Sequence, residues 1–211
     1  MYIVCEGVVW TGKTTQSKNI VRWLQDAYPQ QEVVRIREPG GTEIAEAVRV
    51  IVQGTTFTEA MQPLTDVYLY AAARAQLLGE LVKPAIERKA RIISDRNVCS
   101  SLAYQGRTQG VGMDIVRQIN APAVLEVLPT KILFFDLLVE VGLQRTFDAA
   151  GDKRESKWKE FFDRAYEGYH QIPLQTPLGQ IYQEVDVSGS QEAVLEKLQE
   201  IITPLLPGKQ N

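Results

Sequence analysis

The sequence predicts an α/β protein built on a doubly wound, parallel, five-stranded sheet flanked by helices. Short apolar runs that suit buried parallel strands alternate with longer segments in which apolar residues recur at helical spacing. Polar loops follow three of the runs, and in such sheets these loops meet at the carboxyl edge, where ligands bind. The 211 residues are 45% hydrophobic and 23% charged, which suits one domain over residues 1–211.

The strands are the apolar runs. The first is Tyr2-Ile3-Val4-Cys5, and the third ends in the polar pair Asp95-Arg96. The expected strands cover residues 2–6, 32–36, 91–94, 131–135 and 180–185.

The helices follow from apolar residues three or four apart, such as Ile20 and Leu24, and from their end signals. Pro29 ends the first helix, Thr42 is an N-cap for the second, and Pro84 kinks or restarts the third. The segment from Gly106 to Gly112 is expected to be a connection. Expected helices cover 13–27, 43–53, 58–88, 113–127, 139–147, 156–170 and 190–202, with another starting near Ser100.

The stretch from Gly7 to Thr14 has the spacing G-x-x-x-x-G-K-[ST] between the first strand and the first helix. Glycines let such a loop turn its backbone N–H groups inward, and the helix N-terminus adds its dipole. Lys13 can reach the outer phosphates, and the Thr14 hydroxyl can bind Mg²⁺. The alternative is an ordinary glycine-containing turn. The residues expected to bind a nucleoside triphosphate here are Gly7, Val8, Val9, Trp10, Thr11, Gly12, Lys13, Thr14 and Thr15.

Asp95 ends a strand at the same edge, where a second carboxylate would hold Mg²⁺ directly or through water. Its alternative role is to cap the next helix. Arg96 beside it is a candidate for phosphate contact, because arginine makes charge-assisted bonds to phosphoryl oxygens. Arg37, on the loop after the second strand, is placed to hold the phosphate of an acceptor.

Tyr70 and Arg74 are four residues apart and share a helix face. An aromatic plate beside an arginine with several donors suits a planar base that carries carbonyl groups. The alternative is a core tyrosine and a surface arginine.

Net charge and cysteine content argue against some classes of protein. The net charge of −3 does not suggest a general binder of nucleic acid or of membrane surfaces. Cys5 and Cys99 lack metal-type spacing and read as apolar fillers of a reduced, cytoplasmic protein, and His170 has no partner motif.

Four motifs together resemble the thymidylate kinase family of P-loop nucleoside-monophosphate kinases, over residues 1 to about 190. They are the Gly7–Thr14 loop, the run Arg37-Glu38-Pro39-Gly40-Gly41-Thr42, the stretch Ala71–Gln76, and Asp95–Gln105, which contains Ser-Ser-x-Ala-Tyr-Gln.

The resemblance implies transfer of the γ-phosphoryl of ATP to dTMP, with Mg²⁺, in a cytoplasmic homodimer. Lys13, Thr14 and Asp95 would serve ATP and the metal, and Arg145 would pack on adenine. A mobile lid over about 148–156 would close over the phosphates. Tyr70 would stack on thymine and Arg74 would bond its edge. The residues that would hold dTMP are Arg37, Pro39, Tyr70, Arg74, Arg96, Ser101, Tyr104 and Gln105.

The chain also departs from the family pattern. Neither the phosphate loop nor residues 147–151 contain the arginine that usually touches the transferred phosphoryl, which leaves Lys153 and Arg154 as the lid cations. Val9 stands where the family has an acidic residue that bonds the sugar 3′-hydroxyl, and Trp10 puts a large ring near the phosphate path. Two alternatives therefore stay open: a kinase of another deoxynucleoside monophosphate, or a nucleotide-binding protein with weak catalysis.

Overall fold

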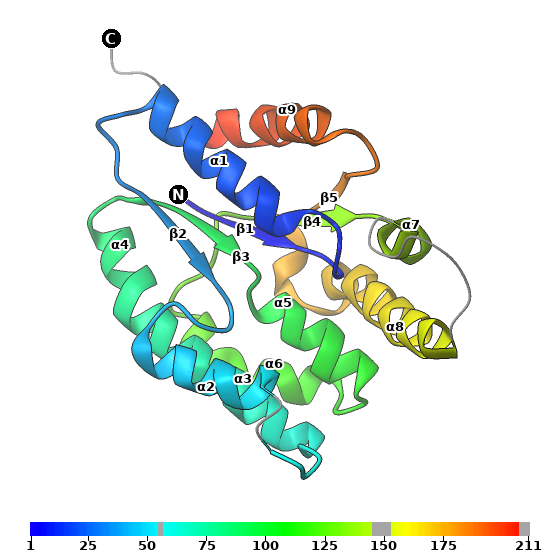
Figure 1. Ribbon diagram of the computed structural model, residues 1–211. Coiled ribbons are helices and arrows are strands. Elements are labelled where there is room, and N and C mark those ends of the chain that lie inside the picture. Colours follow the sequence, from blue (N-terminus) through cyan, green and yellow to red (C-terminus); the bar gives the residue numbers. More distant parts are fainter. Residues whose placement is uncertain (55–56, 145–152, 207–211) are drawn as a thin grey trace.

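In the computed structural model five parallel strands form one sheet in the order β2-β3-β1-β4-β5 (Figure 1). The structure describes residues 1–54, 57–144 and 153–206, with the backbone alone for 153–157. This sheet confirms the predicted fold class, and the strands agree with the predicted ranges to within two residues. They are β1 (Tyr2–Glu6), β2 (Val33–Arg37), β3 (Arg91–Asp95), β4 (Lys131–Asp136) and β5 (Tyr182–Asp186).

Alternation along β1 divides the apolar core between the two faces of the sheet. Ile3 and Cys5 belong to a cluster that includes Ile20 of α1 (Lys13–Ala27) and Leu198 of α9 (Gln191–Ile202). Tyr2 and Val4 belong to the larger cluster on the opposite face. Figure 1 shows α1 and α9 above the sheet and most other helices below it.

The helices of the opposite face bring together the segments that line the site. They are α2 (Glu43–Gln53), α3 (Pro63–Leu77), η1 (Leu78–Val82), α4 (Lys83–Glu87), α5 (Val98–Ser101), η2 (Leu102–Thr108), α6 (Met113–Val124), α7 (Val139–Gln144), α8 (Lys153–Gln175) and η3 (Pro177–Ile181). A short turn of 3₁₀-helix, Thr203–Leu205, follows α9. None of the helices in the described ranges is long and apolar enough to cross a membrane.

Three predicted boundaries were wrong. The helical segment expected over 58–88 begins only at Pro63, and residues 57–62 lie outside any helix. The helix η2 continues through Gly106 to Thr108, so only 109–112 form a connection, because Gly106 packs tightly against the backbone of Met113. The helix expected over 156–170 spans Lys153–Gln175 and therefore includes residues assigned to the lid. Of that lid, residues 148–152 lie outside the described part of the chain.

Pro84 restarts a helix, as predicted. It lies in the first turn of α4, directly after the wide π-helical turn η1. Proline has no N–H to donate and is tolerated in a first turn.

Candidate active site

The phosphate loop joins β1 to α1 and has an unusual backbone. Gly7 has φ 147°, and a Cβ there would lie 2.9 Å from the carbonyl oxygen of Phe135. Gly12 has φ 83° and caps α1, and Trp10 takes up φ 64° although it is not glycine. The turn therefore depends on the two glycines that the motif specifies.

Side chains of this loop are tied to one another and to β3. The Lys13 ammonium donates to the carbonyl oxygen of Val8 and to Thr11 Oγ1, the latter at 3.0 Å. Burial, and then the positive charge of Arg96, hold the pKa of Lys13 well below its usual range. The Thr14 hydroxyl donates to Asp95 Oδ2 at 2.6 Å, so the two predicted metal ligands are in direct contact.

A cavity of about 600 Å³, here called the loop pocket, opens beside these residues. Six cations and two carboxylates line it, which suits a polyanion. Of the predicted ATP-binding residues, Gly7, Val8 and Thr11 do not line it. All three are buried within the loop. Its charged lining residues are Lys13, Lys18, Arg35, Arg37, Glu38, Arg49, Asp95 and Arg96.

Three of those cations, Lys18, Arg35 and Arg49, were not among the residues predicted from the sequence. Arg35 donates to Ser17 Oγ at 3.0 Å and lies 3.4 Å from Asp95 Oδ2. A signal was present, because in a strand Arg35 and Arg37 point to the same face. Arg49 donates from α2 to the carbonyl oxygen of Pro39 at 2.7 Å.

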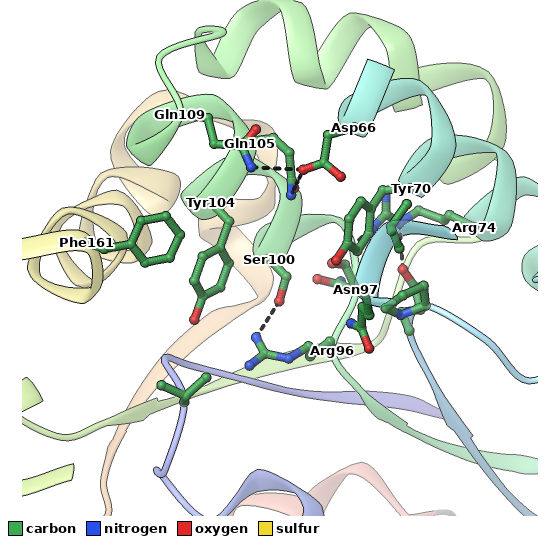
Figure 2. A pocket seen from close by; sticks show the side chains of 15 residues that line it. Asp66, Tyr70, Arg74, Arg96, Asn97, Ser100, Tyr104, Gln105, Gln109 and Phe161 are labelled. Atoms are coloured by element: carbon green, nitrogen blue, oxygen red, sulfur yellow. Dashed lines mark hydrogen bonds and ion pairs between the residues drawn. The ribbon is translucent and has the colours of Figure 1, made fainter. Parts of the chain in front are cut away.

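A second cavity of about 290 Å³, here called the inner pocket, lies deeper between α3, η2 and α8. Tyr70 and Arg74 of α3 lie on one side of it, and Tyr104 and Phe161 on the opposite side (Figure 2). Gln105 and Gln109 each donate to Asp66 Oδ2 at 2.9 Å. The predicted residues Pro39, Tyr70, Arg74, Tyr104 and Gln105 all line this pocket.

Arg74 is buried, so the alternative of a surface arginine is wrong. Its guanidinium donates to Glu38 Oε2 at 2.6 Å, to Asn120 Oδ1 at 2.5 Å and to the carbonyl oxygen of Asn97 at 3.3 Å. It also donates to Ser101 Oγ at 3.0 Å. The pair with Glu38 fixes the guanidinium in the pocket wall.

Ser101, which the family resemblance implies would help to hold dTMP, lines neither pocket. It is 1% exposed and lies behind Arg74, whereas its neighbour Ser100 faces the inner pocket. Asn97, also in this wall, is the N-cap of α5, where its Oδ1 accepts from the Cys99 N–H at 2.8 Å. Successive residues of a helix point about 100° apart, so sequence spacing alone did not separate the two serines.

Arg96 lies at the junction of the two pockets. Among the described residues it is the only cation that lines both, together with Val9, Glu38 and Gln53. Its backbone has φ 79°, a strained value for a residue with a side chain.

Arg37, predicted to hold the phosphate of the acceptor, does not reach the inner pocket. It lines only the loop pocket, and its half-exposed guanidinium pairs with Glu46 Oε1 at 2.9 Å. The loop after β2 therefore brings Pro39, rather than Arg37, to the inner pocket.

The phosphate loop also contacts α8. The Trp10 ring packs edge-on against Phe162 at 5.0 Å between centroids, and Trp158 stacks on the same phenyl ring at 5.8 Å. Trp10 thus lines the loop pocket and also packs against α8 through Phe162. The lid cations Lys153 and Arg154 begin that helix, but their side chains, like all of Arg145, lie outside the described part.

Thr14 and Asp95 fit a bound Mg²⁺. A hydroxyl and a carboxylate are oxygen ligands, which this hard cation prefers, and it commonly takes only one or two protein ligands beside phosphate oxygens and water. Their contact at 2.6 Å, inside the cation-lined loop pocket, places both oxygens where phosphates would arrive.

Comparison with known proteins gives one consistent family. The family model described as thymidylate kinase matches residues 5–198. A thymidylate kinase from Bacillus pumilus is 35% identical over 215 residues, covering 100% of this chain and 98% of the relative. One from Synechococcus sp. is 33% identical over 202 residues, covering 94% and 97%. The crystal structure of a thymidylate kinase from Ehrlichia chaffeensis superposes with a TM-score of 0.78 at 24% identity, over 96% of this chain and 98% of that one.

Proposed function

The chain belongs to the thymidylate kinase family, and on this basis we propose that it transfers the γ-phosphoryl group of ATP to dTMP, giving dTDP and ADP. One observation of the site supports this reaction above the others. A cation-lined pocket at a phosphate loop adjoins a smaller pocket with an aromatic wall, and Arg96 lines both. A transferase needs that arrangement, because donor and acceptor must meet with their phosphates adjacent.

In this proposal the loop pocket holds the triphosphate of ATP. Lys13 turns from its contacts in the loop to the outer phosphates, and Arg35 and Arg49 supply the cationic lining that the phosphate loop lacks. Thr14 and Asp95 hold Mg²⁺, which neutralises charge on the phosphates when it is bound.

The inner pocket holds the thymidine part of dTMP. Tyr70 gives a flat face to the base, Arg74 presents its edge, and Tyr104 closes the opposite side. Arg96 binds the acceptor phosphate and directs one of its oxygens in line with the γ-phosphorus. No protein nucleophile is needed, because positioning and charge carry the reaction. On the ATP side, the proposal gives Arg145 the role of packing on adenine. A lid over 148–156, with the cations Lys153 and Arg154, closes over the phosphates.

Two further properties are proposed from family membership. The protein is cytoplasmic, and it forms a homodimer. Exposed apolar side chains on α2 and α3, two helices packed together, support the second: Ile44, Val50, Leu64 and Tyr68 are 59%, 62%, 45% and 56% exposed.

The test is turnover with a panel of nucleoside monophosphates and ATP, measured as ADP release. We expect dTMP to give the highest kcat/KM, and Lys13→Met to abolish turnover with every acceptor. A preference for dCMP or dGMP would favour the kinase of another monophosphate. Binding of ATP without ADP release that depends on any monophosphate would favour the weakly catalytic alternative.

A further inference from the structure

Glu6 is a buried carboxylate with no role in the reaction as described above. It is the last residue of β1 and is 0% exposed. Its Oε1 accepts from the backbone N–H groups of Asn97 and Ser100 at 2.7 and 3.0 Å. Its Oε2 accepts from the Ser100 hydroxyl and the Tyr169 hydroxyl, both at 2.8 Å, and from the Gly7 N–H at 3.3 Å. Five donors therefore converge on one charge.

The groups around Glu6 Oε2 are also those that hold Arg96. One terminal nitrogen of Arg96 donates to Ser100 Oγ at 2.8 Å, to Tyr169 Oη at 3.2 Å and to the carbonyl oxygen of Gly7 at 3.1 Å. That nitrogen lies 3.9 Å from Glu6 Oε2. The carboxylate and the guanidinium thus share the same two hydroxyl groups.

Proton direction makes this arrangement specific. A hydroxyl has one proton, so when Ser100 and Tyr169 donate to Glu6, only their lone pairs remain for Arg96. Burial, and then the charge of Glu6, raise the pKa of Tyr169 well above its ordinary value, which keeps that proton in place. The two hydroxyl oxygens also lie 2.9 Å apart, a contact in which either can be the donor. Where both protons point to the Glu6 carboxylate, both oxygens present lone pairs to the guanidinium.

We propose that Glu6 is the positioning residue that fixes Arg96 at the junction of the two pockets, acting through the hydroxyls of Ser100 and Tyr169. The strained backbone of Arg96 fits this role, since such a conformation persists only where its surroundings determine it. Tyr169 also connects this network to α8. The kinetic part of the proposal rests on the proposed function, in which Arg96 binds the acceptor phosphate.

The kinetic test compares Glu6→Gln with the surface variant Glu126→Gln, whose side chain is 62% exposed. An amide at position 6 donates where the carboxylate accepts, so the two hydroxyls can no longer both present lone pairs to Arg96. We expect the KM for dTMP to rise about 10-fold or more and the KM for ATP to change less than about 2-fold. A purely structural role would instead lower kcat and thermal stability with both KM values unchanged, and that outcome would overturn the proposal.

Tyr169→Phe provides a second variant if Glu6→Gln does not fold. It removes one shared hydroxyl and leaves the charge, so the KM for dTMP should rise by a smaller factor in the same direction. In the double variant the two effects should be less than multiplicative, because they act through one network. Fully multiplicative effects would mean that the two residues act separately.

A readout that needs no turnover separates this proposal from the proposed function. In ¹⁵N spectra of the ligand-free protein, the Arg96 side-chain N–H signal should be sharp and slowly exchanging in the wild type, and broadened or lost in Glu6→Gln and in Tyr169→Phe. An unchanged signal in both variants would refute the role of Glu6 even if dTMP is the substrate. A wild type that does not phosphorylate dTMP, with these spectral changes present, would refute the substrate and leave the positioning role standing.

Discussion

Val9 faces both pockets with a side chain that cannot accept a hydrogen bond. Its neighbours at the junction, Arg96 and Glu38, are charged, so this apolar side chain interrupts a polar rim. If dTMP lies in the inner pocket with its phosphate at Arg96, the deoxyribose lies near Val9, and its 3′-hydroxyl finds no acceptor in that side chain.

We therefore expect Val9→Asp to sharpen the preference for dTMP over its 3′-deoxy analogue. A new hydrogen bond to a charged acceptor is worth a factor of about 10 in the ratio of kcat/KM values. Steady-state kinetics with the two acceptors measures that ratio, and Val9→Leu is the matched apolar control. An unchanged ratio in Val9→Asp would show that the sugar does not contact this position.

At the level of residues, the sequence predicted which residues line a pocket better than it predicted their side-chain contacts. Lys13, Thr14, Asp95 and Arg96 line one pocket, as expected for residues that a motif or a strand end places at the same edge of the sheet. Ser101 lines neither pocket and Arg37 lines only the loop pocket, because each side chain is held by a residue from another element. The Arg74 guanidinium donates a hydrogen bond to the Ser101 hydroxyl, and Glu46 forms an ion pair with Arg37. The role of Glu6 could not be read from the sequence either, since its partners lie up to 163 positions away.

Among the elements, α8 connects the two pockets. Its adjacent residues Phe161 and Phe162 point in different directions. Phe161 lines the inner pocket near Tyr104, whereas Phe162 supports Trp10 of the phosphate loop. A single helix therefore supports the walls of both pockets.

This division predicts opposite kinetic effects for two neighbouring substitutions. Phe162→Leu should raise the KM for ATP by a factor of about 3 to 10 and leave that for dTMP nearly unchanged, because an aromatic pair of this kind contributes about 0.5–1.5 kcal/mol. Phe161→Leu should do the reverse. Each variant is the control for the other, and a shift of the same constant in both would contradict the separation.

The loop between β2 and α2 depends on Glu46 of α2. Its carboxylate accepts from the Gly41 N–H at 2.8 Å and from Arg37 at 2.9 Å, and these contacts, in that order, lower its pKa. A carboxyl whose pKa is lower in the folded state stabilises the fold above the pKa of the unfolded chain. That contribution is lost as the pH falls through the folded pKa.

We expect Glu46→Gln to flatten the acid side of the stability curve. Between about pH 5 and 3 the free energy of unfolding should fall less steeply than in the wild type. At pH 7 the variant should be less stable by under about 1 kcal/mol, because the side chain is 40% exposed and screened by solvent. Urea unfolding at a series of pH values measures both, and parallel curves would contradict the assignment.

Prediction of elements succeeded where local signals agree and failed where packing decides. The range of α1 was predicted correctly because glycine precedes it and proline follows it. The Gly106–Gly112 segment looked like a loop from its three glycines, yet Gly106 continues a helix that packs closely against Met113, whose Cα would lie 3.1 Å from a Cβ at position 106. Close approach of two backbones is a tertiary property that composition does not encode.

At the scale of the molecule, the two faces of the sheet differ in what surrounds them. One face carries α1 and α9, and the other carries the helices that build the inner pocket (Figure 1). The exposed apolar side chains of α2 and α3 lie on helices of that second group. A proposed dimer that buries them would stabilise α3, the helix whose Tyr70 and Arg74 line the inner pocket.

We expect Leu64→Asp to shift the proposed dimer to monomers, because it places a charge within the apolar surface of α3. Analytical ultracentrifugation over a range of concentrations measures the change. Leu174→Asp is the control, since Leu174 is 83% exposed near the end of α8, a different helix. A wild type that sediments as a monomer would refute the dimer, and dissociation by both variants would refute this location of the interface.

The position of Trp10 has an optical consequence. The chain has three tryptophans, and two of them, Trp10 and Trp158, contact the phenyl ring of Phe162. Trp10 also lines the loop pocket. A polyanion that enters this pocket alters the electric field at an indole whose emission depends on that field. The protein therefore has an intrinsic fluorophore at the loop pocket, and occupancy of that pocket can be followed as a change in emission without any added label.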